Sequence, residues 1–312
     1  MSSPLPAVVA IVGPTAVGKT ALAVRLAQEL GGEIVNADSM QLYIGMDIGT
    51  AKPTVAEQAG IPHHLLDIWA VTHPAAVARY QQLARDAIAD VVSRGGLPIL
   101  VGGSGLYLRG ALDRLEFPGE SPEIRARLYA ELDAVGPGAL HARLTAQDPA
   151  AAAAILPSNG RRIVRALEVI ELTGNPFTAT MPGFESVYRT VFVGLDRDDL
   201  DDRVALRVHE MMRAGFLDEV VGLLPAGLRG SPTAGKALGY AQLLACIDDS
   251  GAVVADLELA VEATISATRR FVRRQRSWFR RDPRVEWLDS AAPEVMQRAV
   301  AAITPTLESC AH

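Results

Sequence analysis

One short motif fixes how this chain begins to fold. Residues 13–20 read GPTAVGKT, a complete G-x-x-x-x-G-K-[ST] phosphate loop, between an apolar run at 7–12 and a helical pattern at 21–30. A strand therefore delivers the loop, glycines let backbone N–H groups close on an anion, and the helix N-terminus adds its positive end. The context argues against a chance glycine-rich turn. The residues expected to bind a diphosphate or polyphosphate are Gly13, Pro14, Thr15, Ala16, Val17, Gly18, Lys19 and Thr20.

Within this loop two side chains have individual expected roles. Lys19 would reach the outer phosphate, and the Thr20 hydroxyl would bind Mg²⁺.

The sequence has only two cysteines, Cys246 and Cys310, without a CxxC pair, so neither a zinc site nor a disulfide framework is indicated. No apolar run approaches the roughly 20 residues of a membrane span, and no signal peptide is visible. We therefore expect a cytoplasmic protein without a membrane partner.

Two further strands are expected to contribute to the same site. A short apolar run at 33–35 predicts a strand, and Asp38 follows it at the edge where open α/β sheets bind ligands. Asp38 is a candidate catalytic carboxylate, with a helix N-cap or a Mg²⁺ ligand as alternatives. A buried-strand pattern at 97–101 leads into GGSGLY rather than into the metal-binding Asp of a typical phosphate-loop NTPase, which lowers the case for an ATPase or GTPase. Ser104 offers a hydroxyl there, although a tight turn without ligand contact is an alternative.

The middle of the chain predicts a helical insertion. Prolines and glycines at 118–122 mark a boundary, and four short helical patterns follow, before a strand pattern at 189–195 returns the chain to the sheet. Ser121 and Asp148 are expected N-caps. Three arginines on the last of these helices either face an anion or form a solvated surface: Arg161, Arg162 and Arg165.

These patterns predict an α/β fold, a P-loop NTPase-like parallel sheet flanked by helices, with a small all-helical insertion domain. The expected core covers 1–114 and 189–312, and the expected insertion covers 115–188. A helix predicted at 200–224 places Arg203 and Arg207 on one face, where either could reach a phosphate or join an intrahelical salt bridge.

A second strong signal is an arginine-rich helix predicted at 256–281. At about 100° per residue, one half is apolar and includes Ile265, Val272 and Phe279. Seven arginines occupy the rest: Arg269, Arg270, Arg273, Arg274, Arg276, Arg280 and Arg281. Although the net charge of the chain is −6, this pattern favours a nucleic-acid contact over a membrane-surface helix or a calmodulin-type target.

Three functions fit these observations. The first is group transfer from a diphosphate donor to a nucleic acid, the second is a small-molecule kinase with the insertion as a lid, and the third is a nucleotide switch or assembly ATPase. The missing strand-end Asp weighs against the third and partly against the second. The arginine helix favours the first.

The motifs together resemble the tRNA dimethylallyltransferase (tRNA isopentenyltransferase, IPP transferase) family of bacterial type along nearly the whole chain. The matching stretches are the phosphate loop, DSMQ at 38–41, GMDIGTAKP at 45–53, GGSGLY at 102–107, RRIVRALE at 161–168, 203–211, Gly239-Tyr240 and 268–280. Val17, Ser104 and Gly160 depart from the usual residues of the family without removing a functional group.

The resemblance implies a donor and an acceptor. The donor is dimethylallyl diphosphate rather than ATP, and the acceptor is the exocyclic amino group of the adenosine 3′-adjacent to the anticodon, in tRNAs that read codons starting with U. It implies Asp38 as the base that deprotonates the amine, and Lys19, Thr20 with Mg²⁺, and Arg207 as the diphosphate clamp. Ser104 would contact the flipped nucleotide.

The resemblance also implies where the tRNA anticodon stem-loop binds, and no obligate protein partner is expected. The implied tRNA-binding residues are Asp38, Ser39, Met40, Gln41, Ser104, Arg161, Arg162, Ile163, Val164, Arg165, Gly239, Tyr240, Arg269, Arg270, Arg273, Arg274 and Arg276. The alternatives are a P-loop small-molecule kinase and an adenylate isopentenyltransferase that acts on a free nucleotide. The arginine helix and the insertion favour tRNA.

Overall fold

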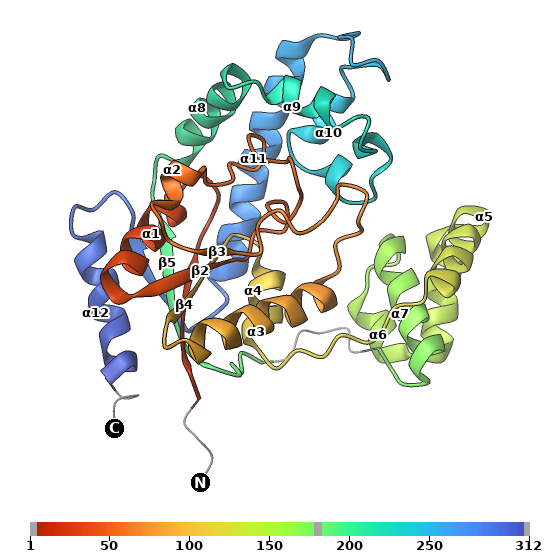
Figure 1. The fold of residues 1–312 in the computed structure, drawn as a ribbon. Helices are drawn as coiled ribbons and strands as arrows, with labels where there is room; N and C mark the ends of the chain where they lie inside the picture. Colours follow the sequence, from red (N-terminus) through yellow and green to blue (C-terminus); the bar gives the residue numbers. More distant parts are fainter. Residues whose placement is uncertain (1–4, 178–182, 309–312) are drawn as a thin grey trace. The chain divides into compact units, whose positions relative to one another are not determined.

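The computed structural model describes residues 5–177 and 183–308. The chain divides into two compact units, which we call the core unit and the insertion unit. The core unit comprises Met1–Asp113 with Ser186–His312, and the insertion unit comprises Arg114–Glu185. Figure 1 shows the elements of each unit.

The core unit is built on a parallel sheet, which confirms the predicted fold class. Within the described residues the sheet has six strands in the order β3-β2-β4-β1-β5-β6. The strands are β1 (Ala7–Val12), β2 (Gly32–Asn36), β3 (His63–His64), β4 (Leu97–Gly102), β5 (Arg189–Asp196) and β6 (Val285–Asp289). Since the chain order reverses around β1, the carboxyl ends of β1, β2 and β4 open onto a common crevice, where such sheets bind ligands.

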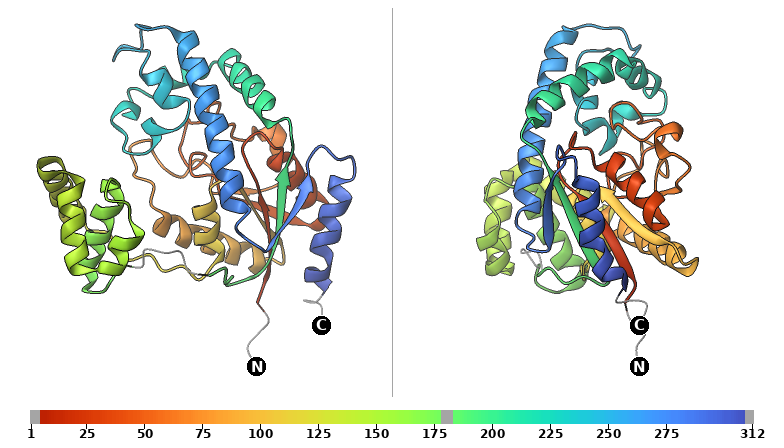
Figure 2. Two further views of the ribbon diagram at one scale, coloured as in Figure 1. Left: turned by 180° about the vertical axis from the view of Figure 1, so that it is seen from behind. Right: turned by 90° about the vertical axis from the view of Figure 1, so that its left-hand side faces the viewer.

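Helices cover both faces of this sheet because its central strands are apolar on both sides. Along β1, Val8, Ala10 and Val12 enter one hydrophobic cluster, whereas Val9 and Ile11 enter another. The flanking helices are α1 (Lys19–Leu30), α3 (Val77–Ser93), α4 (Gly105–Leu112), α8 (Leu200–Arg213), α11 (Leu257–Phe279) and α12 (Val295–Glu308). The long helix α11, pale blue in Figure 2, packs against α8, α10 (Tyr240–Leu244) and α4.

The helix predicted at 200–224 is wrong as a single element. It divides into α8 and α9 (Phe216–Gly222) at Gly215, whose φ of 97° lies in the left-handed region. A glycine adopts this conformation without the steric cost of a side chain. The break separates α9 from α8.

Other elements were not anticipated. β6 and α12 lie in the C-terminal region, for which no structure was predicted, and they complete the sheet edge and cover it beside α1. Short elements lie in the connections: α2 (Val55–Gln58) and the 3-10 turns Leu228–Gly230 and Ala234–Lys236.

In the part of the chain that the structure describes, no helix combines the length and apolarity required to span a bilayer.

The insertion unit consists of α5 (Pro122–Gln147), α6 (Pro149–Ala154) and α7 (Gly160–Thr173). α5 contains a break at Gly136 (φ 78°), so the two helices predicted for this stretch correspond to its two parts. Both expected N-caps are confirmed, since the Ser121 hydroxyl accepts from the Ile124 N–H at 3.3 Å and the Asp148 carboxylate accepts from the Ala151 N–H at 2.9 Å. Apolar residues of all three helices form the core of the unit.

Candidate active site

The phosphate loop has the backbone geometry that its glycines make possible. Gly13 has a φ of 140°, and a Cβ there would lie 2.4 Å from the Leu195 carbonyl oxygen on β5. Gly18, at φ 100°, precedes the first turn of α1. The Lys19 ammonium donates to the Pro14 carbonyl at 2.7 Å across the loop. The loop therefore curls around its own lysine, as expected for a site that cradles phosphate oxygens.

Two side chains from later helices hold this loop in place. Gln275 on α11 accepts from the Thr15 N–H at 3.0 Å through Oε1 and donates through Nε2 to the Gly103 carbonyl at 2.9 Å. Arg203 on α8 donates to the Ala16 carbonyl at 2.9 Å. The predicted phosphate contact of Arg203 is thus replaced by a contact with the loop itself, and Gln275 joins the loop to the turn after β4.

Gln275 was not identified from the sequence. Gln275 is buried, and a Cβ added at Gly103 would lie 2.2 Å from its Nε2 atom. A glutamine facing the buried half of an otherwise arginine-rich helix is the signal that could have singled it out, because a buried amide is retained where its hydrogen bonds are satisfied.

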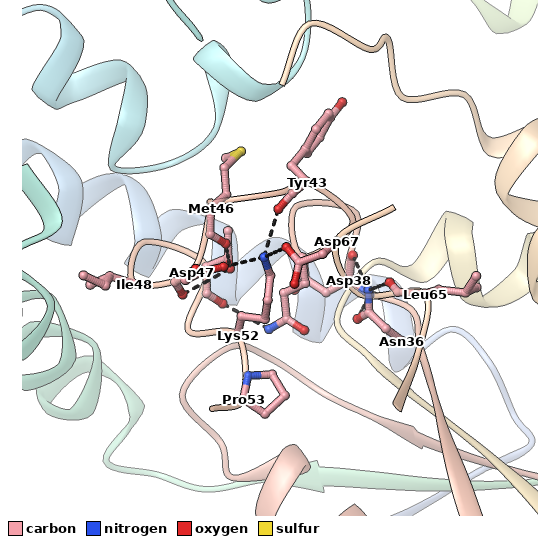
Figure 3. A network of polar contacts seen from close by, with 12 residues as sticks. Asn36, Asp38, Tyr43, Met46, Asp47, Ile48, Lys52, Pro53, Leu65 and Asp67 are labelled. Carbon is pink, nitrogen blue, oxygen red and sulfur yellow. Dashed lines mark hydrogen bonds and ion pairs between the residues drawn. The ribbon is translucent and has the colours of Figure 1, made fainter. Parts of the chain in front are cut away.

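Asp38 lies just beyond β2, in a tight polar turn. Asn36 accepts from the Asp38 N–H at 2.9 Å and donates to the carbonyls of Asp38 and Leu65 at 3.1 and 3.0 Å; Figure 3 shows these three residues. Asp38 Oδ1 accepts from the Met40 N–H at 2.9 Å. Among the described residues, its Oδ2 atom accepts no hydrogen bond, so one oxygen of a held carboxylate is available for a proton.

Asp38, Lys19 and Arg207 influence one another electrostatically. Burial lowers the pKa of Lys19 to about 8, the negative charge of Asp38 opposes this shift, and the positive charge of Arg207 adds to it. Burial also lowers the pKa of Arg207, again opposed by Asp38. Two desolvated cations share one carboxylate, so the site has an excess of positive charge that a polyanion would neutralise.

Asp38 and Arg207 line a cavity of about 370 Å³. Its polar part is lined by Thr15 of the phosphate loop, Asp38, Ser39, Ser104 and Arg207. The Ser104 hydroxyl accepts from the Ser39 N–H at 3.3 Å and lies 3.3 Å from the Ser39 hydroxyl. Its apolar part is lined by Met40, Val204, Val208, Met211, Phe216, Leu238 and Phe271. A cavity lined by both charged and apolar side chains suits a ligand with a diphosphate head and a hydrocarbon chain.

Three predicted tRNA contacts have other roles here. Gln41 donates to the Thr50 and Ala51 carbonyls at 3.1 and 3.2 Å and so holds a neighbouring loop. The hydroxyl of Tyr240 donates to Glu219 at 2.5 Å, and only its ring is left to line the cavity. Gly239, buried at φ 84°, begins the helix of Tyr240. Ser39 and Met40, by contrast, line the cavity as the prediction of substrate contact requires.

The arginine-rich helix predicted at 256–281 is α11, and two of its arginines contact other parts of the core unit. Its apolar half is confirmed, since Ile265, Val272 and Phe279 are buried. However, Arg269 donates to the Asp201 carbonyl, and Arg276 pairs with the Asp196 carboxylate at 2.7 Å. Both guanidinium groups attach α11 to the rest of the core unit, and the RNA contacts predicted for these two residues stay predictions.

Three of the other arginines remain at the surface of α11. Arg270 contacts only the Ser266 hydroxyl of its own helix, and Arg273 is exposed, with no polar partner within the described residues. Arg274 lies 5.6 Å above the Phe271 ring and lines the cavity. These three side chains are available to an anionic partner.

The insertion unit has an arginine-lined groove of about 420 Å³. Arg161 and Arg162 are exposed there, whereas Arg165 is held by Glu168 at 2.9 Å and by the Pro118 and Gly119 carbonyls. Val164 also lines the groove, but Ile163 is fully buried in the core of the unit. The predicted RNA contact of Ile163 is therefore wrong for its side chain. The other members of this set remain candidates.

Comparisons with known proteins identify the family. A family model described as IPP transferase matches residues 41–282. The tRNA dimethylallyltransferase of Streptomyces coelicolor is 62% identical over 293 residues, which cover 93% of each chain. The chain belongs to the tRNA dimethylallyltransferase family. Its members are enzymes, which confirms the resemblance seen in the sequence motifs.

Solved structures of the family have the same fold. The tRNA isopentenylpyrophosphate transferase from Bacillus halodurans matches with a TM-score of 0.70 and 39% identity, covering 98% of this chain and 99% of that one. A eukaryotic dimethylallyltransferase, solved while acting on tRNA, matches with a TM-score of 0.80 and 26% identity over 97% of this chain and 80% of that one.

The pKa of Lys19 gives a testable consequence for this family member. A bound diphosphate favours the ammonium form of Lys19. In the protein without diphosphate, burial lowers the pKa of Lys19 to about 8. Binding above that pH is therefore accompanied by uptake of a proton. We predict that the affinity for inorganic diphosphate falls as the pH rises from about 7 to 9, with proton uptake measurable by calorimetry in two buffers. Lys19→Arg, which stays charged, should lack the uptake and corrects for ionisation of diphosphate itself. A wild-type affinity that follows the Lys19→Arg profile would contradict the prediction.

Proposed function

We propose that this enzyme transfers the dimethylallyl group from dimethylallyl diphosphate to the exocyclic amino group of the tRNA adenosine 3′-adjacent to the anticodon, in tRNAs that read codons starting with U. One observation carries the proposal: Asp38, which has one carboxylate oxygen without a hydrogen bond among the described residues, lines the same cavity as Arg207 and Thr15 of the phosphate loop. The names of the relatives, tRNA dimethylallyltransferase and a dimethylallyltransferase acting on tRNA, support the same substrates.

The chemistry requires a base and a diphosphate clamp. The amino group of adenine is a weak nucleophile because its lone pair is delocalised into the ring, so its attack on the first carbon of the prenyl group must be accompanied by loss of a proton. Asp38 accepts that proton. The bond from this carbon to the diphosphate oxygen breaks, and Lys19, Arg207 and the loop N–H groups stabilise the leaving anion. The apolar cavity lining holds the hydrocarbon and limits access of water.

Mg²⁺ fits this site as a companion of the diphosphate. No group of three or more His, Cys, Asp or Glu residues that could hold a metal occurs in residues 5–177 and 183–308. Mg²⁺ is commonly held by one or two protein oxygens together with substrate phosphates and waters. Thr20 at the start of α1 supplies such an oxygen, and the ion would neutralise charge on the departing diphosphate.

The acceptor base must leave its stack to enter the cavity. Anticodon loops are single-stranded, and enzymes that modify a base in this way extrude it into a pocket. Ser39 and Ser104 would donate to or accept from the polar edge of the adenine beside Asp38. Arg270, Arg273 and Arg274 on α11 would neutralise RNA phosphates, and the groove of the insertion unit supplies a separate candidate surface. A cytoplasmic location is part of the same proposal.

Replacing the base tests the central step. Asp38→Asn keeps the oxygen that accepts from Met40 but cannot take a proton. We predict that single-turnover transfer to tRNA slows by about 10²- to 10⁴-fold while the affinity for dimethylallyl diphosphate changes only a few-fold. Asp202→Asn, an exposed carboxylate on α8, is the matched control. Transfer by Asp38→Asn at close to the wild-type rate would rule out the base assignment.

The exposed arginines of α11 generate a separate prediction. Arg270→Gln with Arg273→Gln should weaken tRNA binding and make its dependence on log salt shallower by about 0.7–0.9 per lost phosphate contact. The affinity for dimethylallyl diphosphate should not change, because neither residue lines the cavity. Arg298→Gln on α12 removes an equally exposed charge and should leave tRNA binding unaltered. An unchanged salt slope in the double variant would show that this face of α11 does not contact RNA.

A further inference from the structure

The loop at 45–53 directs three consecutive backbone N–H groups at one side chain. Glu219 on α9 accepts from Asp47 and Ile48 through Oε2, at 2.9 and 2.6 Å, and from Gly49 through Oε1, at 3.1 Å. Successive N–H groups arranged in this way form a nest that binds anions. Here the protein's own carboxylate fills the nest, so the glycine-containing loop is not a second phosphate loop.

The same carboxylate joins this loop to a third segment. Oε1 also accepts from the Tyr240 hydroxyl on α10 at 2.5 Å. Gly49 lies flat against aromatic rings, since a Cβ there would be 2.2 Å from Phe216 and 2.6 Å from Tyr240. The two rings meet edge to face with centroids 4.9 Å apart. Glu219 therefore joins the loop, α9 and α10 at one junction. At position 49 this junction has no room for a residue larger than glycine.

The other contacts of the loop lead elsewhere. Gln41 holds its carbonyls at Thr50 and Ala51. The buried Lys52 binds the Tyr43 carbonyl and the carboxylates of Asp47 and Asp67, as Figure 3 shows. These contacts attach the loop to the residues that follow β2 and β3. Among the hydrogen bonds of the described residues, only those of Glu219 attach it to α9 and α10.

This junction forms one side of the cavity. Gly49, Thr50, Phe216 and Tyr240 line the same cavity as Asp38 and Arg207, but Glu219 does not line it. A carboxylate that touches no substrate thus determines where one wall stands relative to the base and the clamp. In the proposed reaction, the distance between this wall and Asp38 and Arg207 decides how closely the prenyl carbon and the attacking amine can approach.

We propose that Glu219 is a positioning residue for the transfer reaction, which holds the wall formed by Gly49, Thr50 and Tyr240 at the distance that suits a five-carbon prenyl group beside an adenine. This inference rests on the proposed function. A misplacement of about 1 Å at a reacting centre costs about 10²-fold in rate. Loss of the carboxylate should thus reduce the rate of transfer and relax selection against larger donors, with no effect on the diphosphate site itself.

The experiment compares Glu219→Ala, Glu219→Gln and the control Asp218→Asn, which removes an exposed carboxylate of the same helix. For Glu219→Ala we expect unchanged affinity for inorganic diphosphate, single-turnover transfer from dimethylallyl diphosphate slowed by about 10- to 100-fold, and a lower preference for dimethylallyl over geranyl diphosphate. Glu219→Gln, which retains one accepting oxygen, should be intermediate in both rate and preference. Amide hydrogen exchange at residues 47–49 should rise in the same order.

The outcomes separate the inference from the function on which it depends. If a folded Glu219→Gln or Glu219→Ala protein retains the wild-type rate and donor preference, Glu219 serves stability alone and the inference is wrong. A lower rate with unchanged preference, or a loss of diphosphate affinity, also overturns it. If the wild-type protein binds diphosphate but transfers no prenyl group to tRNA, the proposed function fails instead.

Discussion

The site depends on one electrostatic arrangement, in which a single carboxylate, Asp38, lies near two desolvated cations. Burying Lys19 and Arg207 is unfavourable, as their lowered pKa values show, and Asp38 offsets only part of this cost. A bound diphosphate would compensate the remaining positive charge. In the proposed reaction, the carboxylate that lies near both cations also supplies the base.

This arrangement persists because hydrogen bonds from neighbouring side chains fix its parts. Asn36 fixes the turn that carries Asp38, and Gln275 ties the phosphate loop to the turn after β4. Arg203 holds the loop from α8, one turn before Arg207. Each of these side chains connects segments that end at the same edge of the sheet. Rigid support of this kind is what lets charged groups act without reorganising during the reaction.

The features predictable from the sequence are local. The phosphate loop is specified by eight consecutive residues, and the position of Asp38 follows from a strand that ends shortly before it. The roles of Glu219 and Gln275 could not be predicted, because the backbone groups that they bind lie about 170 residues or more away in the chain. For the same reason the contacts of Arg269 and Arg276 within the core unit could not be predicted, since their partners Asp201 and Asp196 lie on other elements. Helical periodicity also continues across Gly215, so the break that positions α9 was not visible.

Product analysis shows directly whether this enzyme prenylates an adenosine of tRNA. The purified protein would be incubated with tRNA, Mg²⁺ and dimethylallyl diphosphate, without ATP, and the tRNA would then be digested to nucleosides for mass analysis. We expect a dimethylallyl-adenosine from the position 3′-adjacent to the anticodon, with diphosphate released in equal amount. Unmodified tRNA together with prenylated free AMP in a parallel reaction, or a requirement for ATP with release of ADP, would contradict it.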